Sequence, residues 1–259
     1  MKLLALGDVV SDGGCRAITA RLPKIKREYG IDVCIANGEN SACGNGILPD
    51  SAEALISAGV DLITTGNHVF RRREFHDYID EHDYVIRPYN MHPSCPGKGV
   101  GVLDMGRYRV GVINLMGNAF FNANYANPFD SLDRAIDEIS DCKIKIVDFH
   151  AEATGEKRAL GLYADGRVSA FFGTHTHVRT ADAQILPNGT GYITDLGMCG
   201  SETSVLGIEP ERIIRSLKTG MPSVFKAKET DIAINGCIFE INEKSGLTEK
   251  IYSVILREL

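Results

Sequence analysis

Several groups of potential metal ligands each follow an apolar, strand-like run of residues. The apolar run from Val168 to Phe172 leads into Gly173-Thr174-His175-Thr176-His177, which places two histidines one residue apart. Where a strand ends in a turn, successive side chains can point toward one position, as chelation of an ion requires. Similar runs lead into Gly7-Asp8, Gly38-Glu39-Asn40, Gly66-Asn67-His68 and a lone His150.

Each of these residues alone has an ordinary structural explanation. Asp8 could cap a turn, Glu39 could be a solvated acid, and asparagines suit left-handed turns. Packing does not explain the whole set, because buried strands favour apolar residues. Polar side chains after five separate strand-like runs therefore indicate one shared site.

The mixture of ligand types restricts the metal. Carboxylate and amide oxygens combined with imidazole nitrogens suit Mn²⁺, Fe²⁺ or Zn²⁺, whereas an all-oxygen set would favour Mg²⁺ or Ca²⁺. About seven ligands exceed what one ion with an open catalytic position needs. Two ions roughly 3.5 to 4 Å apart, with at least one bridging carboxylate, would use such a set.

Length and composition indicate an ordinary soluble globular enzyme. The 259 residues suffice for one large core, so we expect a single domain spanning residues 1–259. A net charge of -6 argues against duplex nucleic acid as a partner but leaves a small nucleotide open. The seven cysteines are odd in number and lack a Cys-x-x-Cys pair, which favours reduced thiols. With no signal peptide pattern and no membrane-length apolar stretch, we expect a cytoplasmic protein without a membrane partner.

The first half of the chain alternates strand-like and helix-like segments, which predicts a largely parallel sheet. We expect each strand to break at Gly7, Gly38 or Gly66. The candidate ligands then fall at the carboxyl ends of strands, where open α/β sheets bind ligands. The predicted strands cover 2–6, 32–36 and 61–64, and the predicted helices cover 14–29, 49–58 and 72–80.

The second half predicts a second sheet packed against the first, with helices outside. Residues 117–130 and 197–207 lack a clear helix or strand periodicity and are candidates for functional loops. The alternative is that they are surface loops without a role in binding or catalysis. The loop 117–130 could be a lid or the subunit interface of a homo-oligomer. The other predicted elements are a hairpin over 99–105 and 108–115, helices over 132–140 and 156–163, strands over 143–149 and up to His175, and antiparallel strands within 184–194 and 230–256 that close the second sheet.

The order of these motifs resembles the calcineurin-like metallophosphoesterase superfamily, whose pattern is Asp-x-His, Gly-Asp, Gly-Asn-His, His and Gly-His-x-His. Gly38-Glu39-Asn40, Thr180-Ala181-Asp182 and the run from Tyr192 to Met198 look more closely like its YmdB-like branch. The resemblance covers essentially the whole chain. It implies an α/β metallophosphoesterase fold, with two packed β-sheets flanked by helices in a four-layer αββα sandwich.

Two positions depart from the wider superfamily. Val10 stands where Asp-x-His has its histidine, and Glu39 stands where the bridging Asp is expected. The YmdB-like branch resembles this sequence in both respects, which implies that Asn40 replaces the lost histidine. An amide oxygen is a harder ligand than an imidazole nitrogen, so this exchange favours iron or manganese over zinc.

The resemblance also implies roles for individual residues. The two ions would activate a bridging hydroxide for attack on phosphorus, and His68 would protonate the leaving group as general acid. The implied activity is a phosphodiesterase acting on small phosphodiesters, with 2′,3′-cyclic nucleotides as the associated substrates. Asp8, Asn40 and His177 would hold one ion, Asn67, His150 and His175 the other, and Glu39 would bridge them.

Other readings of the sequence stay open at this point. The chain could be a regulatory nucleotide-binding protein in which hydrolysis is incidental to signalling. A metal peptidase or amidase is disfavoured, because the chain contains no His-Glu-x-x-His. We expect His76, His82 and His92 to stay outside the site, whereas Arg71-Arg72-Arg73 could contact solvent, a subunit or a substrate phosphate.

Overall fold

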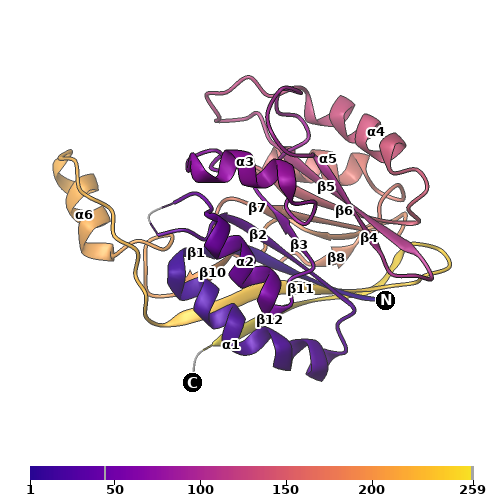
Figure 1. Cartoon of the computed structure of the whole chain (residues 1–259), viewed down its shortest axis with the longest axis horizontal. Coiled ribbons are helices and arrows are strands. Elements are labelled where there is room, and N and C mark those ends of the chain that lie inside the picture. Colours follow the sequence, from indigo (N-terminus) through magenta and orange to yellow (C-terminus); the bar gives the residue numbers. More distant parts are fainter. Residues whose placement is uncertain (44, 258–259) are drawn as a thin grey trace.

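Two mixed β-sheets pack face to face at the centre of the structure, a computed structural model that describes residues 1–43 and 45–257 (Figure 1). Helices lie on the outer face of each sheet, so the predicted αββα sandwich is confirmed. The first six-stranded sheet has the order β12 (Thr248–Arg257), β11 (Ile232–Ile241), β10 (Met198–Ser201), β1 (Lys2–Val10), β2 (Val33–Asn40), β3 (Leu62–Thr64). The second has the order β4 (Val100–Asp104), β5 (Arg109–Met116), β6 (Ile144–His150), β7 (Ala170–Thr174), β9 (Gly191–Ile193), β8 (Gln184–Ile185).

The helices divide between the two outer faces. The helix α4 begins earlier than predicted because Asn127 caps it, accepting a hydrogen bond from the Phe129 amide, and Pro128 occupies its first turn. The first sheet is covered by α1 (Ser11–Tyr29), α2 (Pro49–Ala58) and α3 (Glu74–Glu81), and the second by α4 (Pro128–Glu138) and α5 (Thr154–Tyr163).

The central strands are apolar on both faces because each face packs against another layer. In β1, Leu3 and Ala5 lie in the core between the two sheets, whereas Leu4 and Leu6 pack against the helical layer. This alternation follows from the two-residue period of a strand. A continuous apolar run is therefore what a strand buried on both faces requires.

The strands β1 and β2 continue through the glycines at which the sequence predicted breaks. The prediction was wrong because β-bulges, not chain breaks, change the strand course: the pairing register shifts on both sides of Asp8. A Cβ at Gly7 would lie 1.9 Å from the Gly197 carbonyl oxygen, so this glycine permits close backbone packing inside the strand.

The hairpin predicted over 230–256 forms, but it joins the first sheet and not the second. Strand β11 pairs antiparallel with β1 and also with β12. Alternation along a strand predicts its buried face but does not choose its neighbour. Strands β8 and β9 join the second sheet, as predicted.

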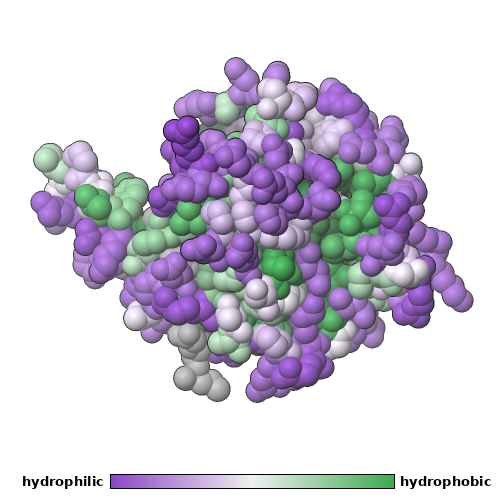
Figure 2. Space-filling view, in the orientation of Figure 1, coloured by the Kyte–Doolittle hydropathy of each residue, from purple (hydrophilic) through white to green (hydrophobic). Residues whose placement is uncertain are grey.

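Helix α6 (Pro210–Thr219) stands away from the body as an arm (Figure 1). None of its residues is buried, and apolar side chains gather on the arm (Figure 2). Leu217 and Val224 are 82% and 81% exposed. Within residues 1–43 and 45–257, no helix is long and apolar enough to cross a membrane.

Candidate metal centre

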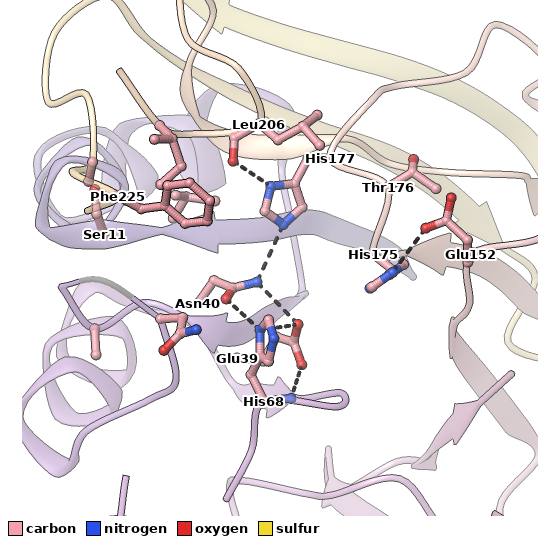
Figure 3. Close-up of a pocket in the computed structure, with 15 residues that line it drawn as sticks. Ser11, Glu39, Asn40, His68, Glu152, His175, Thr176, His177, Leu206 and Phe225 are labelled. Atoms are coloured by element: carbon pink, nitrogen blue, oxygen red, sulfur yellow. Dashed lines mark hydrogen bonds and ion pairs between the residues drawn. The ribbon is translucent and has the colours of Figure 1, made fainter. Parts of the chain in front are cut away.

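The fold gathers all eight sequence-predicted site residues at one end of the two sheets. Strands β1 and β2 are neighbours in the first sheet, and β6 and β7 are neighbours in the second, so their carboxyl ends meet across the interface. Figure 3 shows five of these residues around the resulting cleft. The gathered residues are Asp8, Glu39, Asn40, Asn67, His68, His150, His175 and His177.

Three candidate ligand atoms converge on the Nε2 atom of buried His150. This nitrogen lies 3.1 Å from Glu39 Oε1, 3.2 Å from Asn67 Oδ1 and 3.0 Å from His175 Nδ1. The ligand atoms of Glu39, His150 and His175 all lie within 4.8 Å of one another, close enough to surround one cation. Two nitrogens and two oxygens form a donor set that suits a transition metal.

A second group lies beside the first and is built on Asp8, Asn40 and His177. The Nε2 atom of His177 is 3.3 Å from Asn40 Nδ2 and 3.8 Å from Asp8 Oδ1. The other ring nitrogen, Nδ1, donates to the Leu206 carbonyl oxygen at 3.1 Å. That bond fixes the tautomer, so the lone pair of Nε2 faces the cluster.

The amide of Asn40 connects this group to His68. Its oxygen lies 3.0 Å from His68 Nδ1, and its NH₂ group faces Glu39 Oε1 at 3.1 Å as well as His177. An amide coordinates a metal through oxygen, so Asn40 would have to turn its amide by half a turn to act as a ligand. His68 itself lies beside the cluster, with its backbone amide donating to Glu39 Oε2 at 2.9 Å.

The electrostatics of the cluster couple Glu39 to His150. Burial alone raises the pKa of Glu39, but the charge of His150 and hydrogen bonds from His150 and His68 hold that pKa well below its usual range. Burial alone lowers the pKa of His150, and the charge of Glu39 with those of Asp8 and Asp148 raises it to about 9. For His175, burial and the charge of His150 lower the pKa to about 3, which keeps this imidazole neutral.

Two observations show that the cluster fits cations. Asp8 Oδ1 is fully buried without a hydrogen-bond partner among the described residues, although Oδ2 of the same carboxylate accepts from the His175 amide at 3.0 Å. A buried carboxylate oxygen without a partner is costly unless a cation or a proton satisfies it. A Cβ on Gly66 would lie 2.3 Å from His150 and 2.4 Å from Glu39, so glycine keeps this space open for both ligands.

The residues that orient His150 were not predicted from the sequence. Its Nδ1 lies 2.9 Å from the Thr174 hydroxyl, which in turn donates to Asp148 at 2.7 Å. Asp148 is fully buried, and burial raises its pKa to about 6. The sequence signal was an aspartate two residues before His150 in an apolar strand, on the same face as the histidine.

Glu152 and Phe121 also escaped prediction as site residues. Glu152 Oε2 lies 3.1 Å from His175 Nε2, the arrangement by which a carboxylate orients a metal-binding imidazole. The ring of Phe121 packs 4.9 Å from the ring of His175, so the loop predicted over 117–130 does reach the site. Helix α4 takes up the last residues of that segment.

A buried ion pair holds the segment that carries both histidines. Lys157 Nζ donates to the Thr174 carbonyl oxygen at 2.8 Å and to Asp195 at 2.6 Å. Asp195 in turn accepts from the amide and hydroxyl of Thr176. The turn needs this support because His175 and His177 have positive φ angles of 98° and 62°.

The arginine run and the three histidines expected outside the site do not belong to the gathered set. Arg72 donates to the carbonyl oxygens of Cys43 and Asn45 and so supports a loop at the rim of the cleft. Arg71 and Arg73 are exposed. His76, His82 and His92 lie near Phe70, Tyr78 and Ser94, respectively.

Comparison with known proteins identifies the family. The model of the YmdB-like protein family matches residues 4–254. This chain belongs to the YmdB-like family. A Bacillus subtilis (strain 168) relative named 2′,3′-cyclic-nucleotide 2′-phosphodiesterase is 40% identical over 259 residues, which cover 100% of this chain and 98% of that protein. A putative phosphatase/phosphodiesterase of Mycoplasma pneumoniae is 38% identical and covers 93% of this chain and 88% of its own length.

Solved structures show the same fold. A hypothetical protein from Thermus thermophilus superimposes with a TM-score of 0.94 at 39% identity, covering 100% of both chains. A putative 5′-nucleotidase from Staphylococcus aureus superimposes with a TM-score of 0.58 at 16% identity, covering 98% of this YmdB-like chain and 54% of the nucleotidase. The second likeness extends to the fold alone and relates this chain to the metallophosphoesterase architecture.

Proposed function

We propose that this chain is a metal-dependent phosphodiesterase that hydrolyses 2′,3′-cyclic nucleotides. The observation that carries the proposal is the convergence of Glu39, Asn67 and His175 on His150 Nε2, beside the unpartnered Asp8 oxygen. The name of the Bacillus subtilis relative, a full-length match at 40% identity, supports the substrate class. Two adjacent cation sites suit a phosphodiester because its reaction develops negative charge on several oxygens.

The proposed ligands divide as the sequence resemblance implies. Glu39 lies between the two groups, with one carboxylate oxygen 3.1 Å from both His150 Nε2 and Asn40 Nδ2. An amide oxygen from Asn40 in place of an imidazole supports iron or manganese in preference to zinc. When bound, the ions would polarise the phosphate and lower the pKa of a water molecule. Asp8, Asn40 and His177 would hold one ion, and Asn67, His150 and His175 the other.

In this proposal His68 is the general acid that protonates the leaving group. Its Nδ1 is 3.4 Å from Glu39 Oε1, and its backbone amide donates to Glu39 Oε2 at 2.9 Å, so Glu39 orients the residue even when Asn40 turns its amide toward an ion. The opposite ring nitrogen, Nε2, is then the atom that would give its proton to the departing oxygen. Hydrolysis adds water across the bond between phosphorus and O2′: the water oxygen joins phosphorus and O2′ receives a proton. The product is the nucleoside 3′-phosphate.

The test is an assay of the purified protein loaded with Mn²⁺ or Fe²⁺. The substrates are 2′,3′-cAMP, 3′,5′-cAMP and an aryl phosphodiester, with metal content measured on the same sample. We expect turnover of the 2′,3′-cyclic nucleotide with 3′-AMP as product. Absence of turnover on every substrate, with both metal sites filled, would overturn the proposal.

A further inference from the structure

The cleft at the candidate metal centre is larger than a phosphate group and has two different ends. Its volume is about 430 Å³, within the range of pockets that hold small organic ligands. One end is polar and carries Glu39 and His68. The other end is apolar and is formed at the base of the arm by Leu206 and Phe225 (Figure 3). A ligand that fills the cleft therefore needs an anionic end and an apolar end.

The apolar wall is exposed although it lies inside a cleft. Phe225 is 58% exposed and Leu206 is 50% exposed. Figure 3 shows the Phe225 ring on the same side of the cleft as Ser11 and Leu206. A planar aromatic group could stack on such a ring, and the stacking of one nucleobase on an aromatic side chain is worth about 1–3 kcal/mol.

The wall is held in a defined position relative to the metal centre. Backbone hydrogen bonds pair Val205 with Ile208, and Ile208 bridges to Ala227. Leu206 takes a positive φ of 52° between these pairings. Its carbonyl oxygen accepts the hydrogen bond from His177 Nδ1. Leu206 therefore both lines the apolar end of the cleft and orients a candidate metal ligand. Strain in a bulky residue persists where the surrounding structure holds it, often at binding sites.

The apolar end also contains a polar group, the hydroxyl of Ser11. Ser11 is 2% exposed, and its hydroxyl oxygen has no hydrogen-bond partner among the described residues. Ser11 lines the same cleft and has a positive φ of 60°. A hydroxyl can donate one hydrogen bond and accept two, so it can serve either a ribose hydroxyl or the edge of a base.

From these observations we infer that the apolar end is a nucleoside subsite. Phe225 stacks on the nucleobase, Leu206 covers its edge, and the Ser11 hydroxyl hydrogen-bonds the nucleoside. The phosphodiester lies at the polar end. This inference rests on the proposed function, because it assumes that the substrate is a nucleotide, and it assigns specificity to residues outside the metal-ligand set.

The test compares Phe225→Ala with Val224→Ala in the Mn²⁺-loaded protein. Val224 is the residue before Phe225, is 81% exposed and is not among the described residues that line the cleft, so it controls for a change in this segment. The two substrates are 2′,3′-cAMP and ethylene phosphate, a five-membered cyclic phosphodiester without a nucleoside. We expect Phe225→Ala to lower kcat/KM for 2′,3′-cAMP by roughly 5- to 150-fold and to leave kcat/KM for ethylene phosphate unchanged. Val224→Ala should change neither.

Binding measurements decide the subsite even if the proposed activity fails. Isothermal titration of the Mn²⁺-loaded protein with 3′-AMP and with inorganic phosphate needs no turnover. Phe225→Ala should lower the affinity for 3′-AMP by the same factor and leave the affinity for phosphate unchanged. Phe225→Tyr, which retains the ring, should bind 3′-AMP as the wild-type protein does. Equal effects of Phe225→Ala and Val224→Ala on 3′-AMP, or an equal effect on 3′-AMP and phosphate, would overturn the subsite. Absence of turnover by the wild-type protein would overturn only the proposed function.

Discussion

The two ends of the cleft are built in different ways. The polar end is formed where strands of both sheets end. Asp8, Glu39 and His150 are buried there, and a chain of hydrogen bonds through Thr174 to Asp148 supports His150. The apolar end is formed by loop residues at the base of an exposed arm, and Phe225 and Leu206 remain half exposed. Metal binding needs fixed ligand positions, whereas stacking on an aromatic ring tolerates small displacements. The fold therefore places the more demanding chemistry on its more rigid elements.

The largest expected effect follows from Glu39→Gln at the polar end. This change removes the carboxylate whose Oε1 lies 3.1 Å from both His150 Nε2 and Asn40 Nδ2, and we expect loss of metal and of activity together. The matched control is Glu152→Gln, the same chemical change at a half-exposed carboxylate that only orients His175. That control should lose about 10- to 100-fold in metal affinity or activity. Elemental analysis gives the metal content of each variant, and kcat gives its activity. Full metal content in Glu39→Gln would contradict a bridging role for Glu39.

His68→Ala should separate proton transfer from metal binding. We expect both metals to remain and turnover to fall by about 10²- to 10⁴-fold for a substrate with an alkoxide leaving group. An aryl phosphodiester, whose leaving group needs no proton, should be affected much less. Metal analysis and paired rate measurements check this, and loss of metal from the variant would show that His68 is a ligand.

Lys157→Met tests the support beneath the two histidines of the polar end. Removal of the lysine leaves Asp195 charged and buried, so the free energy of unfolding should fall by about 3–5 kcal/mol. The control is Lys98→Met, which breaks an exposed pair with Asp83 and should change stability by about 0–1 kcal/mol. Urea unfolding of both variants measures the difference, and equal destabilisation would show that the buried pair does not hold this turn.

The smallest effect is expected at Ser11, which lies at the apolar end. Ser11→Gly and Ser11→Ala both remove the hydroxyl, but only glycine adopts a φ of 60° without steric strain. We expect the glycine variant to be more stable than the alanine variant by about 1 kcal/mol. Urea unfolding of the two variants measures this difference. A glycine variant less stable than the alanine variant would show that the backbone at Ser11 is not strained.

The sequence predicted the elements of the fold better than their pairing. Helix α2 and hairpin β4–β5 appear close to the predicted positions because periodicity and turn residues are local signals. Strands β11 and β12 were expected in the wrong sheet, and β1 and β2 were expected to end too early. Both errors concern neighbours and bulges, which depend on residues distant in the chain.

The residues of the candidate metal centre could be named from the sequence alone. Polar ligand types after apolar strands are a local pattern, and Asp8, Glu39, His150 and His175 are found together as that pattern predicts. Only the tertiary structure showed what surrounds them: Asp148 and Lys157 beneath the ligands, Glu152 beside His175, and Phe225 across the cleft. The physical reason is that a ligand is recognised by its own chemistry. A supporting or wall residue acquires its role only from the groups that folding brings within contact distance.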